Sequence, residues 1–182
     1  YPTSQKQILK IITEKTKNNE IFYQKHMTHH IIKNTRLDWL NKGHNCFLIR
    51  HPAKVINSYI KKNSLMNIDD IGFKKQYEIF NKLKKNKINY TVINADMILR
   101  DPSKTIKKLC KILKIRFTKK MLNWPKGKRS SDGIWSKVWY KNVELSNSFS
   151  KFKKENYNVP KKYNNIYEES LNYYNEMNQY SI

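Results

Sequence analysis

The sequence predicts an α/β fold with a mainly parallel sheet. Three short apolar runs, at about residues 21–25, 46–50 and 90–94, have the composition of buried strands. The run Cys46–Ile49 lacks polar alternation, which is typical of a strand covered on both faces, as in parallel sheets. A tight turn and a helical pattern follow it directly. A length of 182 residues suits one hydrophobic core, and we expect a single domain over residues 1–182.

The unit at residues 46–62 has the order strand, turn, helix. His51-Pro52 ends the strand, because proline fixes its own φ and moves the preceding residue out of the α region. Pro52 then fits the first turn of a helix. Ligands of open α/β sheets bind at the carboxyl ends of strands. Arg50 lies at such an end, so we expect it to bind an anion. Ser58 lies about two helical turns into the helix, where its hydroxyl could reach the same anion.

Periodicity and end signals predict the remaining helices. Ser4 and Gln7 form a capping-box pattern at the start of a helix over about Ser4–Lys17. Asp101-Pro102 opens another helix, which runs to Lys114. Further helices are expected at Thr35–Gly43, at 73–85, from Lys137 to about Phe149, and at 163–177.

The composition is strongly basic. Lys and Arg number 37 against 14 Asp and Glu, for a formal net charge of +23. This excess predicts an anionic partner or substrate, although codon bias in an AT-rich genome would also produce abundant Lys, Asn, Ile and Tyr. The chain has no single dense basic arm of the kind that marks a nucleic-acid-binding tail. No apolar run reaches the ~20 residues of a membrane-spanning helix.

The two cysteines, Cys46 and Cys110, do not make a disulfide framework. They lie in a predicted strand and a predicted helix, and free buried thiols are typical of a reducing compartment. Because the cytoplasm is such a compartment, we predict a cytoplasmic protein. The chain begins at Tyr1 without an initiator Met, and we expect a segment upstream of it.

The pattern around Arg50 and Ser58 resembles the nucleotide-binding segment of sulfotransferases that use 3′-phosphoadenosine 5′-phosphosulfate (PAPS). In that family an Arg at a strand end and a Ser in the following helix hold the 3′-phosphate of the nucleotide, and Pro52 and Tyr59 also match. An Arg fork and a Ser hydroxyl together suit a phosphate dianion. The resemblance implies PAPS as co-substrate and no metal.

Residues 124–137 combine glycines, cations and Trp135. This composition predicts a mobile loop that can fold over an anion with its backbone N–H groups pointing inward. The loop resembles the C-terminal loop of the same sulfotransferases. The resemblance implies that Lys128 and Arg129 contact the 3′-phosphate, with Gly133 and Trp135 as hinge and anchor.

Lys25 and three histidines resemble the family's strand that carries a lysine and then the catalytic base. In the commonest family pattern the histidine lies two residues after the lysine, where this chain has Met27. His26, His29 and His30 bracket that position, and a bacterial branch of sulfotransferase-like proteins carries a similar Lys-x-Met-x-His-His stretch. A neutral imidazole, with an unperturbed pKa of ~6.5, suits the removal of an alcohol proton. Which of the three is the base stays open; a metal site is not expected, since no Cys, Asp or Glu lies nearby.

The resemblance implies the P-loop NTPase-like fold of sulfotransferases, a three-layer α/β/α sandwich with a mainly parallel sheet. It covers nearly the whole chain but omits the family's first strand and the loop that binds the 5′-phosphosulfate, because no strand and Gly/Ser-rich turn precede Ser4. The implied reaction is transfer of the sulfuryl group to a hydroxyl or amine. The acceptor, a small molecule or a glycan, is left open.

Two other functions stay open from the residues alone. A basic nucleic-acid-binding domain without enzymatic activity would account for the net charge and the interleaved Tyr and Trp residues. A nucleotide kinase would share the fold, but the chain has neither a Walker lysine pattern nor an evident Mg²⁺ site. We expect the sulfotransferase function.

Overall fold

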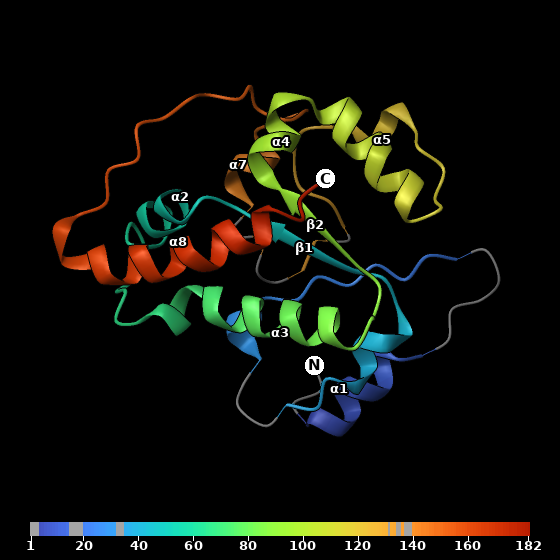
Figure 1. The fold of residues 1–182 in the computed structure, drawn as a ribbon. Helices are drawn as coiled ribbons and strands as arrows, with labels where there is room; N and C mark the ends of the chain where they lie inside the picture. The colour runs from blue at the N-terminus through green and yellow to red at the C-terminus, as the bar shows by residue number, and fades with distance from the viewer. Residues whose placement is uncertain (1–3, 15–19, 32–34, 131, 134–135, 137–139) are drawn as a thin grey trace. The chain divides into compact units, whose positions relative to one another are not determined.

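The structure is a computed structural model of the chain, and it describes all residues except 1–3, 15–19, 32–34, 131, 134–135 and 137–139 (Figure 1). The chain divides into two compact units. The first joins Tyr1–Ile93 to Asn156–Ser181, and the second comprises Asn94–Glu155 with Ile182.

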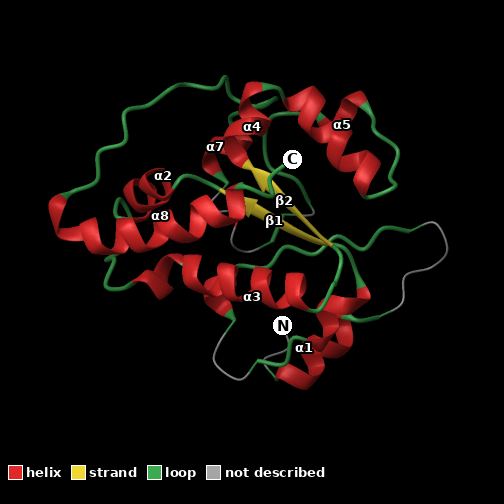
Figure 2. Cartoon of the chain, in the orientation of Figure 1, coloured by secondary structure: helices red, strands yellow, loops and turns green. Residues whose placement is uncertain are grey.

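The sheet has two strands, β1 (Asn45–Ile49) and β2 (Tyr90–Asn94). They lie side by side with their arrowheads in the same direction (Figure 2). The connection between them contains α2 (Pro52–Tyr59) and α3 (Phe73–Lys85), since parallel neighbours need a crossover rather than a tight hairpin. The α/β class and the predicted strands at 46–50 and 90–94 are confirmed.

Burial alternates along β1. Phe47 and Ile49 are buried, whereas Leu48 is 58% exposed and Cys46 is also exposed. Successive side chains of a strand point to opposite faces, so only one face of β1 meets the core. The prediction of a strand covered on both faces is therefore wrong, and of the two cysteines Cys110 alone is a buried thiol.

The predicted strand at residues 21–25 is absent. This segment has no regular secondary structure and forms no ladder with another described residue, and Ile21, Phe22 and Tyr23 are exposed. Its composition favours a strand, but a strand also requires a neighbour that satisfies its backbone groups. The segment is held instead by Gln24, whose side-chain amide donates to the carbonyl oxygen of Ile12 at 2.7 Å.

The core of the first unit forms where α8 (Asn164–Asn178) packs against α2 and α3 (Figure 1). Phe80 is almost fully buried at its centre and meets the rings of Phe47 and Tyr90 edge to face. Such aromatic pairs bury large areas in a preferred geometry. The buried cluster comprises Leu40, Phe47, Ile49, Phe73, Ile79, Phe80, Leu83, Val92, Tyr174 and Met177.

Three further elements of the first unit are short. Helix α1 (Gln5–Ile12) begins at the Ser4 cap as predicted, and ends at Ile12 because Thr13 leaves the helical conformation. The predicted helix at Thr35–Gly43 is the 3₁₀ helix η2 (Asp38–Lys42), which buries Leu40. A second 3₁₀ helix, η5 (Lys161–Tyr163), precedes α8.

The 3₁₀ helices η1 (Thr28–His30) and η3 (Ile68–Ile71) pack against each other and against α3. Gly72 ends η3 with a φ of 70°, and its carbonyl oxygen accepts a hydrogen bond from the Thr28 hydroxyl at 3.0 Å. A Cβ at Gly72 would lie 2.6 Å from that hydroxyl oxygen. Glycine is required here both for the left-handed backbone and for the close approach of η1.

The second unit is helical in the part that the structure describes. Its helices are α4 (Ala95–Arg100), α5 (Pro102–Ile112), the 3₁₀ helix η4 (Lys119–Met121) and α7 (Lys141–Glu144). Asp101 caps α5 by accepting from the backbone N–H of Lys104 at 2.9 Å, as the sequence predicts. Helix α7 falls inside the helix predicted from Lys137 to Phe149 but is much shorter. Among the helices described in both units, none has the length and apolar character needed to cross a bilayer.

We predict that Gly72→Ala lowers the free energy of unfolding by more than the roughly 1–2 kcal/mol that a left-handed L-residue costs. The added methyl group also displaces Thr28. Urea denaturation followed by circular dichroism measures the change. Gly43→Ala is the matched control, because Gly43 has a φ of −148° and no atom within 4 Å of an added Cβ; equal losses for both variants would contradict this account.

Candidate functional site

The turn between β1 and α2 positions Arg50. His51 is the N-cap of α2, and its Nδ1 atom accepts a hydrogen bond from the backbone N–H of Ala53 at 3.3 Å. Pro52 occupies the first turn and is buried. Because proline has no N–H group, it is tolerated where that group would have no partner within the helix. The turn thus leaves Arg50 directly after the last residue of β1.

Arg50 and Ser58 are both exposed. In the described part of the chain, neither side chain forms a hydrogen bond or an ion pair. The guanidinium group is therefore available to an anion from outside, and the hydroxyl of Ser58 on α2 is a second available donor. A guanidinium fork and a hydroxyl are donors that suit a phosphate dianion.

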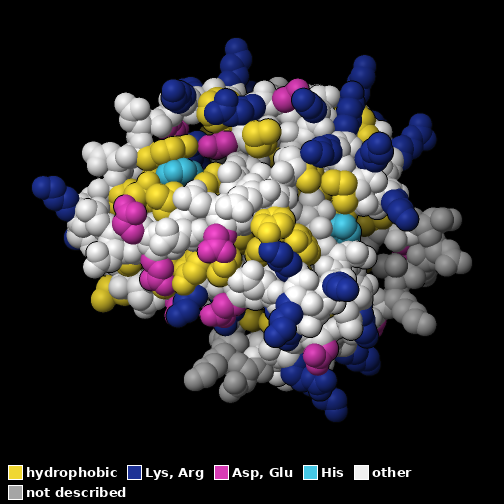
Figure 3. All heavy atoms as spheres, in the orientation of Figure 1, with side chains coloured by type: hydrophobic (Ala, Val, Ile, Leu, Met, Phe, Trp, Pro, Cys, Tyr) yellow, Lys and Arg dark blue, Asp and Glu magenta, His cyan; other side chains and the backbone are white. Residues whose placement is uncertain are grey.

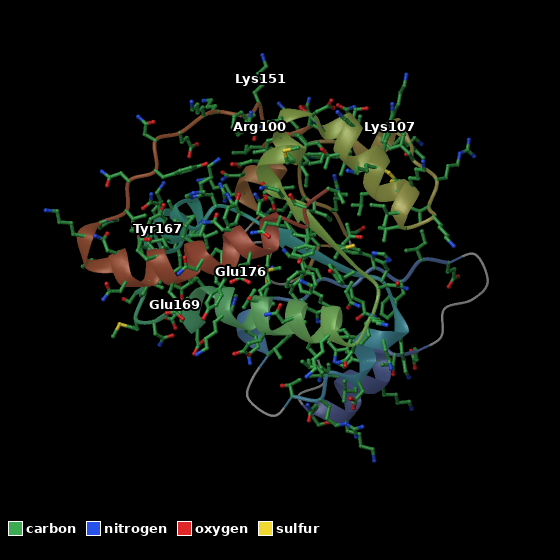
Figure 4. All side chains as sticks on the ribbon, in the orientation of Figure 1. Arg100, Lys107, Lys151, Tyr167, Glu169 and Glu176 are labelled. Carbon is green, nitrogen blue, oxygen red and sulfur yellow. The ribbon has the colours of Figure 1, made fainter. Side chains whose placement is uncertain are left out.

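An aromatic contact braces this turn from the distant segment before η5. The rings of His51 and Tyr157 stack with centroids 3.6 Å apart and planes 9° apart. The Asn57 side chain donates to the carbonyl oxygen of Asn158 at 2.8 Å, so the same segment also holds α2. Tyr167 and Tyr174 of α8 surround the other sides of His51. Figure 4 labels Tyr167 on α8.

Sequence reasoning missed Tyr157 and Lys54. Tyr157 lies about a hundred residues after His51, between two predicted helices and outside any predicted element, so no local pattern could have linked the two. Lys54 is buried on α2, with its ammonium group 5.7 Å from the centre of the Tyr157 ring. The sequence signal for this burial is the helical periodicity, which places the cation Lys54 on the side of α2 that faces inward.

The histidine segment is attached to the same part of the first unit. His29 and His30 lie in η1, which packs against η3, and η3 also contacts α2. Asp70 of η3 caps that element by accepting from the backbone N–H groups of Met66 and Asn67. Element η3 thus contacts both η1, which carries His29 and His30, and α2, which carries Ser58.

The three histidines differ in their surroundings. The ring of His26 lies 4.8 Å from that of Trp39, and its Nε2 atom is 3.0 Å from the Gln24 side-chain oxygen. Desolvation lowers the pKa of His26. Desolvation also lowers the pKa of His29, with a further lowering by His30 and an opposing effect from Asp70. His29 and His30 meet edge to face at 4.3 Å.

The remaining residue of the predicted catalytic segment is Lys25, the last residue of the largely exposed stretch 21–25. Lys25 is exposed, and its two neighbours in the sequence, Gln24 and His26, contact each other through their side chains. It does not end a strand, contrary to the sequence prediction. Among the described residues, no group of three or more His, Cys, Asp or Glu side chains could hold a metal ion.

The predicted phosphate loop lies in the second unit. Its base is fixed by Trp124, whose backbone N–H donates to Asn147 and whose indole N–H donates to the Ser146 hydroxyl at 3.1 Å. Gly127 has a φ of 99°, a conformation that favours glycine. Its N–H donates to the carbonyl oxygen of Glu144 at 2.8 Å.

Lys128 and Arg129 of this loop are exposed. The backbone N–H of Arg129 donates to the Asp132 carboxylate at 2.9 Å, which closes a turn beside the two cations. Gly133 is exposed and has no atom within 4 Å of an added Cβ, so no packing requires glycine there. Trp135, the predicted anchor, lies outside the described residues.

Comparison with known proteins identifies relatives of the chain. A family model described as "Sulfotransferase domain" matches residues 1–181. Two Arabidopsis thaliana proteins are similar over most of the chain: branched-chain-amino-acid aminotransferase-like protein 1, 31% identical over 153 residues, and branched-chain-amino-acid aminotransferase-like protein 2, 28% identical over 151 residues. No solved structure matches.

The two plant proteins are much longer than this chain. The similar region covers 84% and 83% of the chain, but 27% of each plant protein. Their names describe a likeness to aminotransferases, whereas the region that they share with this chain makes up only part of their length.

We predict that His26 and His29 titrate below ~6.5 in the folded protein. The unfolded chain then binds protons at these sites at a higher pH than the folded chain does. Their contribution to stability is complete above ~6.5 and is lost as the pH falls toward the folded pKa values. NMR titration of the imidazole Cε1–H signals measures both midpoints.

Asp70→Asn separates the causes of the His29 shift. Its carboxylate raises the pKa of His29, so the variant should lower the His29 midpoint further. The midpoint of His26, whose shift has desolvation as its cause, should stay constant and serves as the internal control. A His29 midpoint that rises in the variant would contradict this assignment.

Proposed function

Because the chain belongs to the sulfotransferase domain family, we propose that it transfers a sulfuryl group from PAPS to a hydroxyl or amine of an acceptor. The observation that carries the proposal is the pair of available donors at the β1–α2 unit, Arg50 and Ser58. Their positions agree with the resemblance found in the sequence, and the family match supports that resemblance.

In this proposal Arg50 and Ser58 hold the 3′-phosphate of the nucleotide. Arg50 supplies a permanent positive charge at the end of β1, and Ser58 supplies a neutral donor from α2. The stack of His51 on Tyr157 keeps the intervening turn in place without using either donor. A pre-formed arrangement of this kind lowers the ordering cost of binding.

We assign the general base to His29. Its lowered pKa favours the neutral imidazole at pH 7, which can accept a proton, and it is exposed in η1. His26 is engaged with Trp39 and Gln24, so we assign it a supporting role beside His30. As the acceptor oxygen or nitrogen bonds to sulfur, its proton passes to His29 and the bond from sulfur to the nucleotide's phosphate oxygen breaks.

The other proposed roles rest on the sequence resemblance. Lys25 would neutralise charge on the leaving phosphate, an electrostatic contribution to catalysis. Lys128 and Arg129 would bind the 3′-phosphate, with Gly133 and Trp135 as hinge and anchor. We further propose that the whole protein has the three-layer α/β/α fold with a P-loop-like phosphosulfate site, that it is cytoplasmic, and that its acceptor is a small molecule or a glycan.

The nucleotide assignment predicts that Arg50→Ala weakens binding of 3′-phosphoadenosine 5′-phosphate by roughly 1.5–3 kcal/mol, the value of a charge-assisted hydrogen bond. Binding of adenosine 5′-monophosphate, which lacks the 3′-phosphate, should not change. Isothermal titration calorimetry measures both. Arg36→Ala is the control, because Arg36 is equally cationic but pairs with Asp38 at 2.9 Å. Equal losses for the two nucleotides would exclude a 3′-phosphate contact.

The base assignment predicts that His29→Asn slows sulfuryl transfer about 10²- to 10⁴-fold while 3′-phosphoadenosine 5′-phosphate binds as before. Release of that nucleotide from PAPS, measured with a panel of hydroxyl and amine acceptors, gives the rate. His26→Asn and His30→Asn are matched variants from the same segment and should have smaller effects. A larger loss in either one would transfer the role of base to that histidine.

A further inference from the structure

Positive charge is concentrated in one part of the second unit. Residues 102–131 contain eleven Lys and Arg and no Asp or Glu, although they make up about a sixth of the chain. The cations are spaced rather than contiguous, so they form no basic arm in the sequence. In the structure Lys and Arg side chains gather over α5 on the visible face, whereas Asp and Glu gather over α3 and α8 (Figure 3).

Helix α5 presents its lysines on one side. Lys104, Lys107, Lys108 and Lys111 all fall within an arc of roughly 100°, given about 100° of rotation per helical residue. All four are exposed, and Thr105 and Cys110 are buried on other sides of the helix. The lysine side of α5 therefore faces solvent, and the helix packs through its other sides. Figure 4 labels Lys107 on this helix.

The chain after α5 adds two exposed lysines, Lys119 and Lys120 of η4. The Cys110 thiol contacts the Met121 sulfur at 3.7 Å, which holds η4 against the end of α5. The ammonium group of Lys107 lies 5.4 Å from the centre of the Phe117 ring, which fastens the intervening chain. We define the α5 cation face as Lys104, Lys107, Lys108, Lys111, Lys119 and Lys120. In the described part of the chain, none of these six ammonium groups pairs with a carboxylate.

We propose that the α5 cation face docks onto a bilayer that contains anionic phospholipids. Clusters of four to eight Lys or Arg on an amphipathic helix are typical of segments that bind anionic lipid headgroups. All six cations of the face are lysines, which act as point charges toward headgroup phosphates and need no fixed partner geometry.

Two exposed apolar side chains near the end of α5 favour a bilayer over other polyanions. Ile112 follows the last lysine of α5 and is 37% exposed, and Met121 follows the lysines of η4 and is 36% exposed. The contact of Met121 with Cys110 places both apolar side chains at the same end of α5. A lipid interface accepts such side chains among the headgroups, whereas a phosphate backbone or an anionic glycan gives them no partner.

The aromatic residues of residues 102–131 do not favour single-stranded nucleic acid. That recognition stacks bases on exposed rings. Phe117 is partly buried beneath Lys107, and Trp124 is partly buried against Phe149 with its indole N–H bonded to Ser146. Neither ring is presented between the lysines of the face.

The test uses vesicles of phosphatidylcholine with about one third phosphatidylserine and measures partitioning of the full chain by sedimentation at about 0.15 M ionic strength. The triple variant Lys104→Gln, Lys108→Gln and Lys111→Gln should bind about 100-fold more weakly. Lys107 is left in place because it contacts Phe117. The matched control replaces Lys74, Lys82 and Lys85 of α3, also exposed, by Gln and so removes the same charge; it should bind within about threefold of the wild type.

A second arm separates lipid from nucleic acid. Ile112→Ser with Met121→Ser should weaken vesicle binding and leave binding to a short DNA duplex unchanged. Circular dichroism melts verify that each variant is folded. The proposal is overturned if the α5 and α3 variants lose equal vesicle binding, or if the wild type binds pure phosphatidylcholine vesicles with the same strength. It is also overturned if the chain binds the DNA duplex through α5 but does not bind vesicles.

Discussion

The sharp turn at His51-Pro52 is the constraint on which the candidate site depends. Only two residues separate the end of β1 from the start of α2. Proline suits the first turn of the helix, because it has no N–H group that would need a partner there. The His51 ring caps the helix through Nδ1 and stacks on Tyr157 with its face. One side chain thereby fixes both the direction of α2 and the segment that covers it. Arg50 is left exposed at the end of the strand, and Ser58 is carried on the helix.

The position of the histidine segment depends on Gly72, because a side chain at this residue would collide with Thr28. Gly72 ends η3 in a left-handed conformation and lets the Thr28 hydroxyl reach its carbonyl oxygen. This contact seats η1 beside Asp70, whose charge opposes the effect of desolvation on the pKa of His29. Element η3 thus helps to position the proposed base, while desolvation and His30 lower its pKa against the opposing charge of Asp70.

Acidic groups on α3 and α8 have hydrogen-bond or ion-pair partners, whereas the lysines of α5 are exposed. On α3 and α8, acidic side chains contact nearby donors: Glu78 pairs with Lys75, and Glu176 accepts from the Tyr77 hydroxyl. Figure 4 labels Glu176 on α8. On α5 the lysines have no such partners among the described residues, apart from the contact of Lys107 with Phe117. Exposed cations without partners repel one another, so they favour an anionic surface that relieves the repulsion.

Local signals in the sequence determined the α/β class, the strands at β1 and β2, and the caps at Ser4, His51-Pro52 and Asp101, because these depend on neighbours a few residues apart. Sequence also supplied Arg50, Ser58 and the histidines as candidates, through a resemblance that the family match supports. Tertiary structure alone decided that residues 21–25 form no strand, that β1 is buried on one face, and that Tyr157 braces His51. Strand pairing, burial and stacking each need a partner that folding brings from far along the chain, and composition at one position does not specify that partner.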